Sequence, residues 1–141
     1  MYGSHRYVLF ADDDKDDISL MEEAFRKKNI TEKLVSVQNG NELLNYLYSI
    51  NGNNKLPQLI LLDLNMPAKG GKETLAELKQ HASLKTIPVI IYSTSDNPIE
   101  IKECYKLGAN SYVVKPTTFD KLLQTIEVIH SYWCKTATVS F

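Results

Sequence analysis

The chain has 141 residues, 43% of them hydrophobic, with 16 Lys and Arg against 17 Asp and Glu. This length fits one domain, which can bury roughly 68–70% of its unfolded surface. The formal net charge of −1 gives no general attraction to nucleic acid or to an anionic membrane. The longest apolar runs are far shorter than the ~20 residues that cross a bilayer. We therefore expect neither nucleic acid nor a membrane as a partner.

The cysteines and histidines give weak signals. Cys104 and Cys134 have no CxxC spacing, and no secretion signal is visible, so we expect a cytoplasmic protein with free thiols. Cys104 should pack as a small apolar residue on a helix. His5, His81 and His130 share no metal-ligand spacing, and we expect all three at the surface.

Short apolar runs alternate with segments of helical periodicity, as is typical of βαβ units. The expected strands are Arg6–Ala11, Lys33–Val37, Gln58–Leu62, Pro88–Tyr92 and Ser111–Val114. Amphipathic helices are expected around Ile18–Phe25, Leu43–Leu47, Leu75–Ala82, Ile101–Tyr105 and Phe119–Trp133. The pattern predicts an α/β fold with a doubly wound, five-stranded parallel sheet and five helices.

The expected domain spans residues 6–132. Residues 1–5 show no strand or helix pattern and are expected to be a leader or a cloning remnant. Tyr48–Pro57 is expected to form a longer surface loop. The helical pattern ends at about Tyr132, which predicts a short tail, residues 133–141. This tail is either poorly ordered or pairs with a partner or a second subunit.

Polar side chains stand at the ends of four predicted strands. Asp12 and Asp13 follow the first strand and Asp63 follows the third, while Ser93 and Lys115 follow the fourth and fifth. In open α/β sheets, ligands bind beyond the carboxyl ends of the strands. All five side chains should therefore point toward one place.

Three carboxylates gathered there would repel one another unless a cation compensates. Oxygen-only ligands favour Mg²⁺, with Mn²⁺ as a substitute. We expect Asp13 and Asp63 to bind the ion directly and Asp12 to act through water. The main-chain carbonyl of Asn65 would complete the protein ligands. Taken alone, Asp12 and Asp13 could equally begin a helix, and simple capping is the expected role of the neighbouring Asp14, Asp16 and Asp17.

A phosphate site is the chemistry that this arrangement favours. With the ion offsetting charge repulsion, Asp63 can act as a nucleophile toward a phosphoryl group and form an acyl phosphate. The product carries about −1.5 to −2 charges and needs donors around it. Lys115 would supply an ammonium group and Ser93 a hydroxyl.

Five motifs in order resemble the receiver domain of bacterial two-component response regulators, over roughly residues 7–132. They are Asp12-Asp13-Asp14, Leu61–Pro67, Ser93, Gly108-Ala109 and Tyr112–Pro116. The resemblance implies a flavodoxin-like sheet in the order 2-1-3-4-5 and a required Mg²⁺. It also implies phosphorylation of Asp63 by a sensor histidine kinase or a phosphotransfer protein, and a cis peptide bond before Pro116.

The same resemblance implies a switch and an output surface. Ser93 would move toward the phosphoryl group, and Tyr112 would turn inward to fill the space. The surface made by the fourth helix, the strand Ser111–Val114 and the fifth helix would then change its preference for a downstream protein target, and could also form a homodimer. Signalling would pass through such contacts or through a phosphorelay.

This chain departs from the usual family pattern at three places. Serine stands at position 93 where threonine is commoner, Tyr92 is bulkier than usual, and Ala68-Lys69-Gly70-Gly71 lacks an acidic-Gly pair. None of these changes removes a catalytic group. The long Tyr48–Pro57 loop and the lack of an attached output domain resemble the small single-domain regulators that pair with bacterial phytochromes.

Three other functions compete with this one. Phosphatases of the haloacid dehalogenase type need a second Asp two residues after the nucleophile, and Asn65 stands there. Flavin mononucleotide binding needs a phosphate loop after the first strand, where Asp12-Asp13-Asp14 would repel phosphate. The third is a receiver-like interaction domain that no longer uses phosphate.

Overall fold

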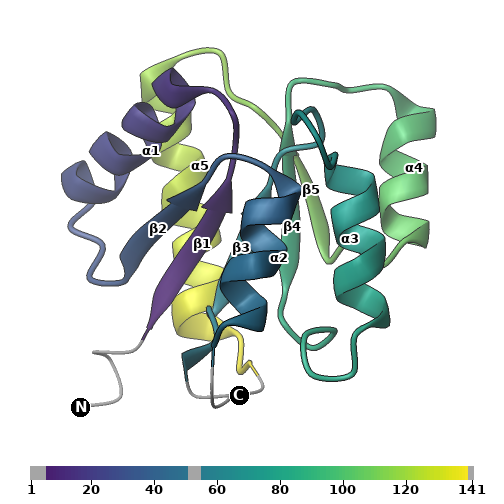
Figure 1. Cartoon of the computed structure of the whole chain (residues 1–141). Helices are drawn as coiled ribbons and strands as arrows, with labels where there is room; N and C mark the ends of the chain where they lie inside the picture. The colour runs from purple at the N-terminus through teal and green to yellow at the C-terminus, as the bar shows by residue number, and fades with distance from the viewer. Residues whose placement is uncertain (1–5, 51–54, 140–141) are drawn as a thin grey trace.

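The computed structural model describes residues 6–50 and 55–139, which form a central sheet between two layers of helices (Figure 1). The strands are β1 (Tyr7–Ala11), β2 (Lys33–Val37), β3 (Leu59–Leu62), β4 (Val89–Ser93) and β5 (Ser111–Val114). The helices are α1 (Lys15–Lys27), α2 (Gly40–Tyr48), α3 (Gly71–Gln80), α4 (Pro98–Lys106), α5 (Phe119–Ile129) and the π-helical η3 (His130–Thr136).

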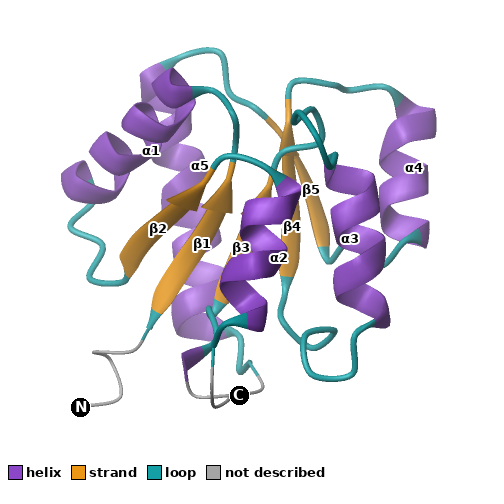
Figure 2. Ribbon diagram, viewed as in Figure 1, coloured by secondary structure: helices purple, strands orange, loops and turns teal. Residues whose placement is uncertain are grey.

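The strands are all parallel and lie in the order β2-β1-β3-β4-β5. This confirms the predicted doubly wound sheet, and Figure 2 shows strands and helices alternating along the chain. The chain leads from β1 to β2 at one edge of the sheet and from β3 through β4 to β5 at the other edge. The strand order therefore reverses between β1 and β3. Their carboxyl ends form the crevice where this topology binds ligands.

Side chains of the central strands alternate between two cores. Val8 and Phe10 of β1 face α1 and α5, whereas Leu9 and Ala11 face α2, α3 and α4. All four residues of β3 and all five of β4 are buried. Both faces are covered, which explains why these strands are continuously apolar in sequence.

Polar side chains begin most of the helices. Asp14, Asn39, Asn97 and Thr118 each accept a hydrogen bond from a backbone N–H in the first turn of α1, α2, α4 and α5. These contacts satisfy donors that the helix leaves free. The capping role expected for Asp14 is confirmed.

Four strand boundaries, in β1, β3 and β4, differ from the sequence prediction by one residue. Arg6 and Gln58 precede β1 and β3, and their side chains bond to each other at 2.7 Å instead. Pro88 lies outside β4 because proline has no backbone N–H to donate, while Ser93 belongs to the strand. The strands Lys33–Val37 and Ser111–Val114 agree with the prediction.

The predicted boundary at residue 132 is wrong. The chain continues as η3 to Thr136, and Cys134 is buried at 4% exposure. Arg6 and Gln58 donate hydrogen bonds to the carbonyls of Cys134 and Trp133, which fixes this turn to the domain. A π-helix has wider turns than an α-helix, so the 3.6-residue pattern breaks although the helical backbone continues. The expected leader, residues 1–5, and part of the expected Tyr48–Pro57 loop lie outside the described residues.

The histidines and cysteines follow the sequence prediction only in part. His130 is not a surface residue: its side chain is 15% exposed and bonds to Glu32 at 2.7 Å. His5 lies outside the described residues. Cys104 is fully buried in the core, as predicted, and both cysteines are free thiols.

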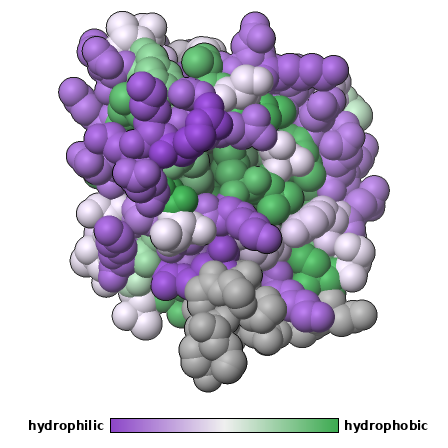
Figure 3. Space-filling view, turned by 90° about the vertical axis from the view of Figure 1, so that its left-hand side faces the viewer, coloured by the Kyte–Doolittle hydropathy of each residue, from purple (hydrophilic) through white to green (hydrophobic). Residues whose placement is uncertain are grey.

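The side of the molecule where α1 and β2 lie is mostly hydrophilic, with hydrophobic side chains gathered near its middle (Figure 3). The edge strand β2 contributes Leu34, Val35 and Val37, which remain half-buried. Within the described ranges, no helix combines the length and hydrophobicity needed to span a bilayer.

Candidate functional site

Backbone hydrogen bonds beyond the strands place the site residues. The N–H of Asp63 donates to the carbonyl of Ala11 at 3.0 Å, and the N–H of Lys115 donates to the carbonyl of Ser93 at 2.7 Å. These bonds extend the parallel ladder by one residue on β3 and on β5. Asp63 therefore lies beside Asp12, and the backbone of Lys115 is bonded to that of Ser93, as the strand-end pattern predicts.

The three acids form a tight cluster at this edge. Asp12, Asp13 and Asp63 each offer a carboxylate oxygen, and these oxygens lie within 4.8 Å of one another. Asp12 is fully buried and Asp63 is 4% exposed, whereas Asp13 is exposed. Asp12 also accepts a hydrogen bond from the N–H of Asp14 at 2.9 Å, which fixes its carboxylate against the turn.

Lys115 points into this cluster. Its Nζ atom donates to Asp12 at 2.8 Å and to Asp17 at 2.7 Å, and it lies 3.6 Å from Oδ2 of Asp63. The same ammonium group lies 5.5 Å from the centre of the Tyr92 ring. Four side chains, from α1 and from the ends of β1, β3 and β4, thus converge on this one cation.

Burial and charge change the acidity of these groups. Burial, opposed by the Lys115 charge and aided by the charge of Asp12, raises the pKa of Asp63 to about 6. Burial likewise raises the pKa of Asp12, against the hydrogen bond from Lys115. Burial alone would lower the pKa of Lys115, but its bonds to Asp12 and Asp17 raise it above the ordinary value. One ammonium is thus shared by more carboxylates than it can neutralise.

The loop after Asp63 is tightly packed against α3. A Cβ atom on Gly71 would lie 2.3 Å from the carbonyl oxygen of Asp63, so only glycine fits there. Ala68 has a φ of 64°, a left-handed conformation that costs an L-residue about 1–2 kcal/mol. Asn65 is exposed, and its N–H lies 3.5 Å from Oδ1 of Asp63. The role of its carbonyl as a metal ligand stays a prediction.

Ser93 and Tyr112 both contact the loop that follows β4. Ser93 is fully buried, and its hydroxyl accepts a hydrogen bond from the N–H of Ser95 at 3.2 Å. The hydroxyl of Tyr112 donates to the carbonyl of Ser95 at 2.8 Å. Both residues therefore touch Ser95, so movement of either one acts on the same loop.

The cis bond expected before Pro116 is wrong. The Lys115–Pro116 bond is trans, and the described part of the chain contains no cis peptide. X–Pro bonds favour the trans form by about 0.5–1 kcal/mol, and trans geometry is compatible with Lys115 reaching the acids.

Two members of the site were missed in the sequence. Asp17 was expected only to support the start of α1, but its side chain binds Lys115. Its place in the first turn of α1 gave no separate signal, because the helix dipole already explains an acid there. Tyr92 is 5% exposed and packs edge-on against Phe10, and no sequence pattern distinguishes this position from ordinary core.

The cluster suits a hard divalent cation. Its donors are carboxylate oxygens, it is open to solvent at Asp13, and Lys115 leaves negative charge uncompensated. Mg²⁺ and Mn²⁺ accept such oxygen ligands together with several waters. The residues present therefore fit a divalent metal site.

Comparisons with known proteins agree with this geometry. Residues 8–127 match the family model described as the response regulator receiver domain. Response regulator Rcp1 of Synechocystis sp. is 35% identical over 136 residues, which cover 95% of this chain and 92% of Rcp1.

Solved structures share the same fold. The phosphorylated cyanobacterial phytochrome response regulator RcpA has a TM-score of 0.88 and 38% identity, covering 97% of this chain and 99% of RcpA. The Mn²⁺-bound form of Rcp1 has a TM-score of 0.84 and 34% identity, covering 96% of this chain and 99% of Rcp1. Together with the family match, these similarities show that this chain belongs to the response regulator receiver domain family.

Proposed function

We propose that Asp63 is the phosphoacceptor of this response regulator. Receiver domains of this family are signalling proteins that take phosphate from histidine kinases or phosphotransfer proteins. The observation that carries the assignment is the position of Asp63, 3.6 Å from the Lys115 ammonium and within 4.8 Å of the carboxylates of Asp12 and Asp13. Asp12, which follows β1, is instead bonded to Lys115 and to the N–H of Asp14.

Transfer of the phosphoryl group forms one bond and breaks one. A carboxylate oxygen of Asp63 attacks the phosphorus of a phosphohistidine, the P–N bond breaks, and the imidazole nitrogen keeps the electron pair and takes a proton. With a pKa of about 6, Asp63 is mostly ionised at neutral pH and can act as the nucleophile. Lys115 and the hydroxyl of Ser93 are the donors for the phosphoryl oxygens.

Mg²⁺ is the proposed ion, with Mn²⁺ as a substitute. Asp13 and Asp63 would bind it directly, Asp12 would act through water, and the main-chain carbonyl of Asn65 would complete the protein ligands. When bound, the ion offsets repulsion between the phosphoryl oxygens and the acids. The Mn²⁺-bound form of the homologue Rcp1 supports a divalent ion here.

Turnover of an external substrate is not part of this proposal. The chain would catalyse its own phosphorylation from small phosphodonors and its own slow dephosphorylation. The natural donor would be a sensor kinase of the phytochrome class, a choice supported by the similarity to RcpA, a cyanobacterial phytochrome response regulator. A cytoplasmic location suits this donor and the free thiols.

Output would pass through the surface of α4, β5 and α5. Ser93 would move toward the phosphoryl group and Tyr112 would follow, pulling on Ser95 between them. Ile99, Tyr105 and Val114 are large apolar residues with 70%, 48% and 44% exposure on α4 and β5. These side chains suit a downstream protein target or a second copy of the chain.

Mass spectrometry tests the phosphoacceptor. Incubation with acetyl phosphate and Mg²⁺ should add one phosphoryl group to the wild type and none to Asp63→Asn. Asp120→Asn is the matched control, because Asp120 is an exposed acid in the first turn of α5. Equal uptake by Asp63→Asn and the wild type would contradict the assignment.

Size-exclusion chromatography with and without beryllofluoride tests the homodimer separately.

A further inference from the structure

A second group of metal-ligating side chains lies at the opposite end of the sheet. Glu32 immediately precedes β2, and His130 and Cys134 are four residues apart on η3. Each offers one donor atom, and the carboxylate oxygen, imidazole nitrogen and sulfur lie within 4.8 Å of one another. Residues distant in sequence thus bring oxygen, nitrogen and sulfur donors together, away from Asp63.

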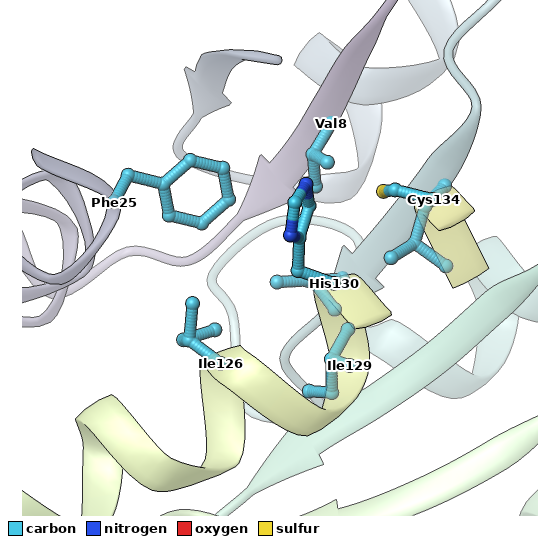
Figure 4. A pocket seen from close by; sticks show the side chains of 8 residues that line it. Val8, Phe25, Ile126, Ile129, His130 and Cys134 are labelled. Atoms are coloured by element: carbon cyan, nitrogen blue, oxygen red, sulfur yellow. The ribbon is translucent and has the colours of Figure 1, made fainter. Parts of the chain in front are cut away.

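The donor atoms face one another. Nε2 of His130 lies 2.7 Å from Oε1 of Glu32, and Figure 4 shows the Cys134 sulfur turned toward the His130 ring. In a tetrahedral zinc site with bonds of ~2.0–2.3 Å, donor atoms stand about 3.3–3.8 Å apart. Small side-chain movements would convert the present contacts into such a site.

The donors are largely shielded from bulk water. Glu32 and Cys134 are 8% and 4% exposed, and a cavity of about 10 Å³ beside His130 and Cys134 is lined otherwise by apolar side chains. Figure 4 shows Val8, Phe25 and Ile126 among them. This space is about one water molecule in size, which suits a single water ligand.

Arg6 leaves the proposed donors available. Its guanidinium donates to the carbonyl of Cys134 at 2.6 Å and to Gln58 at 2.7 Å. It faces Oε2 of Glu32 at 4.0 Å, whereas His130 contacts Oε1. Arg6 therefore fixes the backbone of η3 and orients the Glu32 carboxylate without occupying the position between the three donors.

We propose that Glu32, His130 and Cys134 bind one thiophilic divalent cation, with Zn²⁺ as the best match. A thiolate and an imidazole select Zn²⁺ over the Mg²⁺ that suits the carboxylate cluster. Cys134 would bind as the thiolate and release its thiol proton to solvent, and His130 would bind through Nε2 of the neutral imidazole. One thiolate and one carboxylate then balance the charge of the ion.

Such a site would join η3 to the start of β2. Its effect on the domain is structural, since it lies away from the carboxyl ends of the strands, where Asp63 stands. Ion binding should raise the melting temperature without being needed for phosphate uptake.

Zinc titration tests the proposal. The chelator-treated chain is held in saturating Mg²⁺, so that the carboxylate cluster is occupied, and Zn²⁺ is titrated against a chromophoric chelator. The wild type should bind one tight equivalent and gain thermal stability. Cys134→Ser, His130→Gln and Glu32→Gln should each weaken binding at least roughly tenfold. Cys104→Ser and His81→Gln are the matched controls and should bind as the wild type does.

Cobalt substitution gives a test that does not depend on a Cys134 variant folding. The sequence contains two cysteines, so a thiolate-to-Co²⁺ charge-transfer band in Cys104→Ser can only come from Cys134. This band is expected in Cys104→Ser and in the wild type. Its absence from Cys104→Ser, or unchanged zinc affinity in folded His130→Gln and Glu32→Gln, would overturn the proposal. Beryllofluoride binding at Asp63 verifies that each variant is folded.

Discussion

The ammonium of Lys115 lies 2.7 Å from a carboxylate oxygen of Asp17, although the two residues are 98 positions apart in the chain. This contact joins the first turn of α1 to the end of β5. It also draws the ammonium toward α1, since the distance from Lys115 to Asp63 is longer, at 3.6 Å. Asp17 therefore competes with Asp63 for the same cation.

Removing this competition should strengthen binding of a phosphoryl mimic. In Asp17→Asn, Lys115 loses one charged partner and becomes freer to contact a group on Asp63. We expect a severalfold tighter apparent affinity for beryllofluoride, measured by NMR titration. The control is Asp16→Asn, which alters an exposed acid in the same turn. Unchanged or weaker binding in Asp17→Asn would show that Asp17 does not compete for Lys115.

Asp63 should destabilise the metal-free fold at neutral pH. Its pKa rises from 3.8 to about 6, so the folded state binds more protons than the unfolded state between these values. The stability associated with this group is fully present below pH 3.8 and is lost as the pH rises through about 6. The difference corresponds to roughly 3 kcal/mol at most.

Urea unfolding in a chelator measures this effect. Asp63→Asn should be more stable than the wild type at pH 7, and its advantage should shrink as the pH falls from 6 to 4. Asp120→Asn should show no such pH-dependent gain, because Asp120 is exposed. A wild type that is more stable than Asp63→Asn at pH 7 would contradict the raised pKa.

Replacing Ala68 by glycine should stabilise the loop after Asp63. The φ of 64° at Ala68 is a conformation that glycine adopts without the steric cost of a Cβ atom. We expect a gain of about 1 kcal/mol in the free energy of unfolding. Ala76→Gly, inside α3, should instead lose about 1 kcal/mol. If Ala68→Gly and Ala76→Gly lower the free energy of unfolding by similar amounts, position 68 is not strained.

Ser93→Ala should separate phosphate uptake from signalling. The variant keeps Asp63 and Lys115 and should still bind beryllofluoride. It loses the hydroxyl that accepts from the N–H of Ser95, so the loop before α4 loses its contact with the end of β4. NMR shift changes in α4 on beryllofluoride binding should disappear. Thr94→Ala, at the exposed neighbouring position, should retain them. Full-sized changes in Ser93→Ala would rule out a switch through this hydroxyl.

The sheet and the acid cluster could be predicted because they depend on local patterns. Continuous apolar runs mark buried parallel strands, and the residue after each run must lie at one edge. Asp12, Asp63 and Lys115 followed from that rule alone. Asp17 did not, because its position in a first helical turn has an adequate local explanation, and only the packing of α1 against α5 brings it to Lys115.

The carboxyl end of the chain was harder to predict for a different reason. The sequence pattern assumes 3.6 residues per turn, and η3 departs from that period. His130 and Cys134 lie four residues apart on one face of η3, beyond or near the point where the sequence pattern ended. Their environment also depends on Glu32 and Arg6, which are close in space and remote in sequence.

Position 71 has no acceptable alternative to glycine while the loop keeps its present path. A Cβ atom at this position would lie 2.3 Å from the carbonyl oxygen of Asp63 and would overlap it. The first turn of α3 and the carbonyl of Asp63 must therefore move as one unit. A survey of natural relatives with this loop length should find this site invariant, and random mutagenesis should recover replacements only alongside compensating changes in residues 64–70.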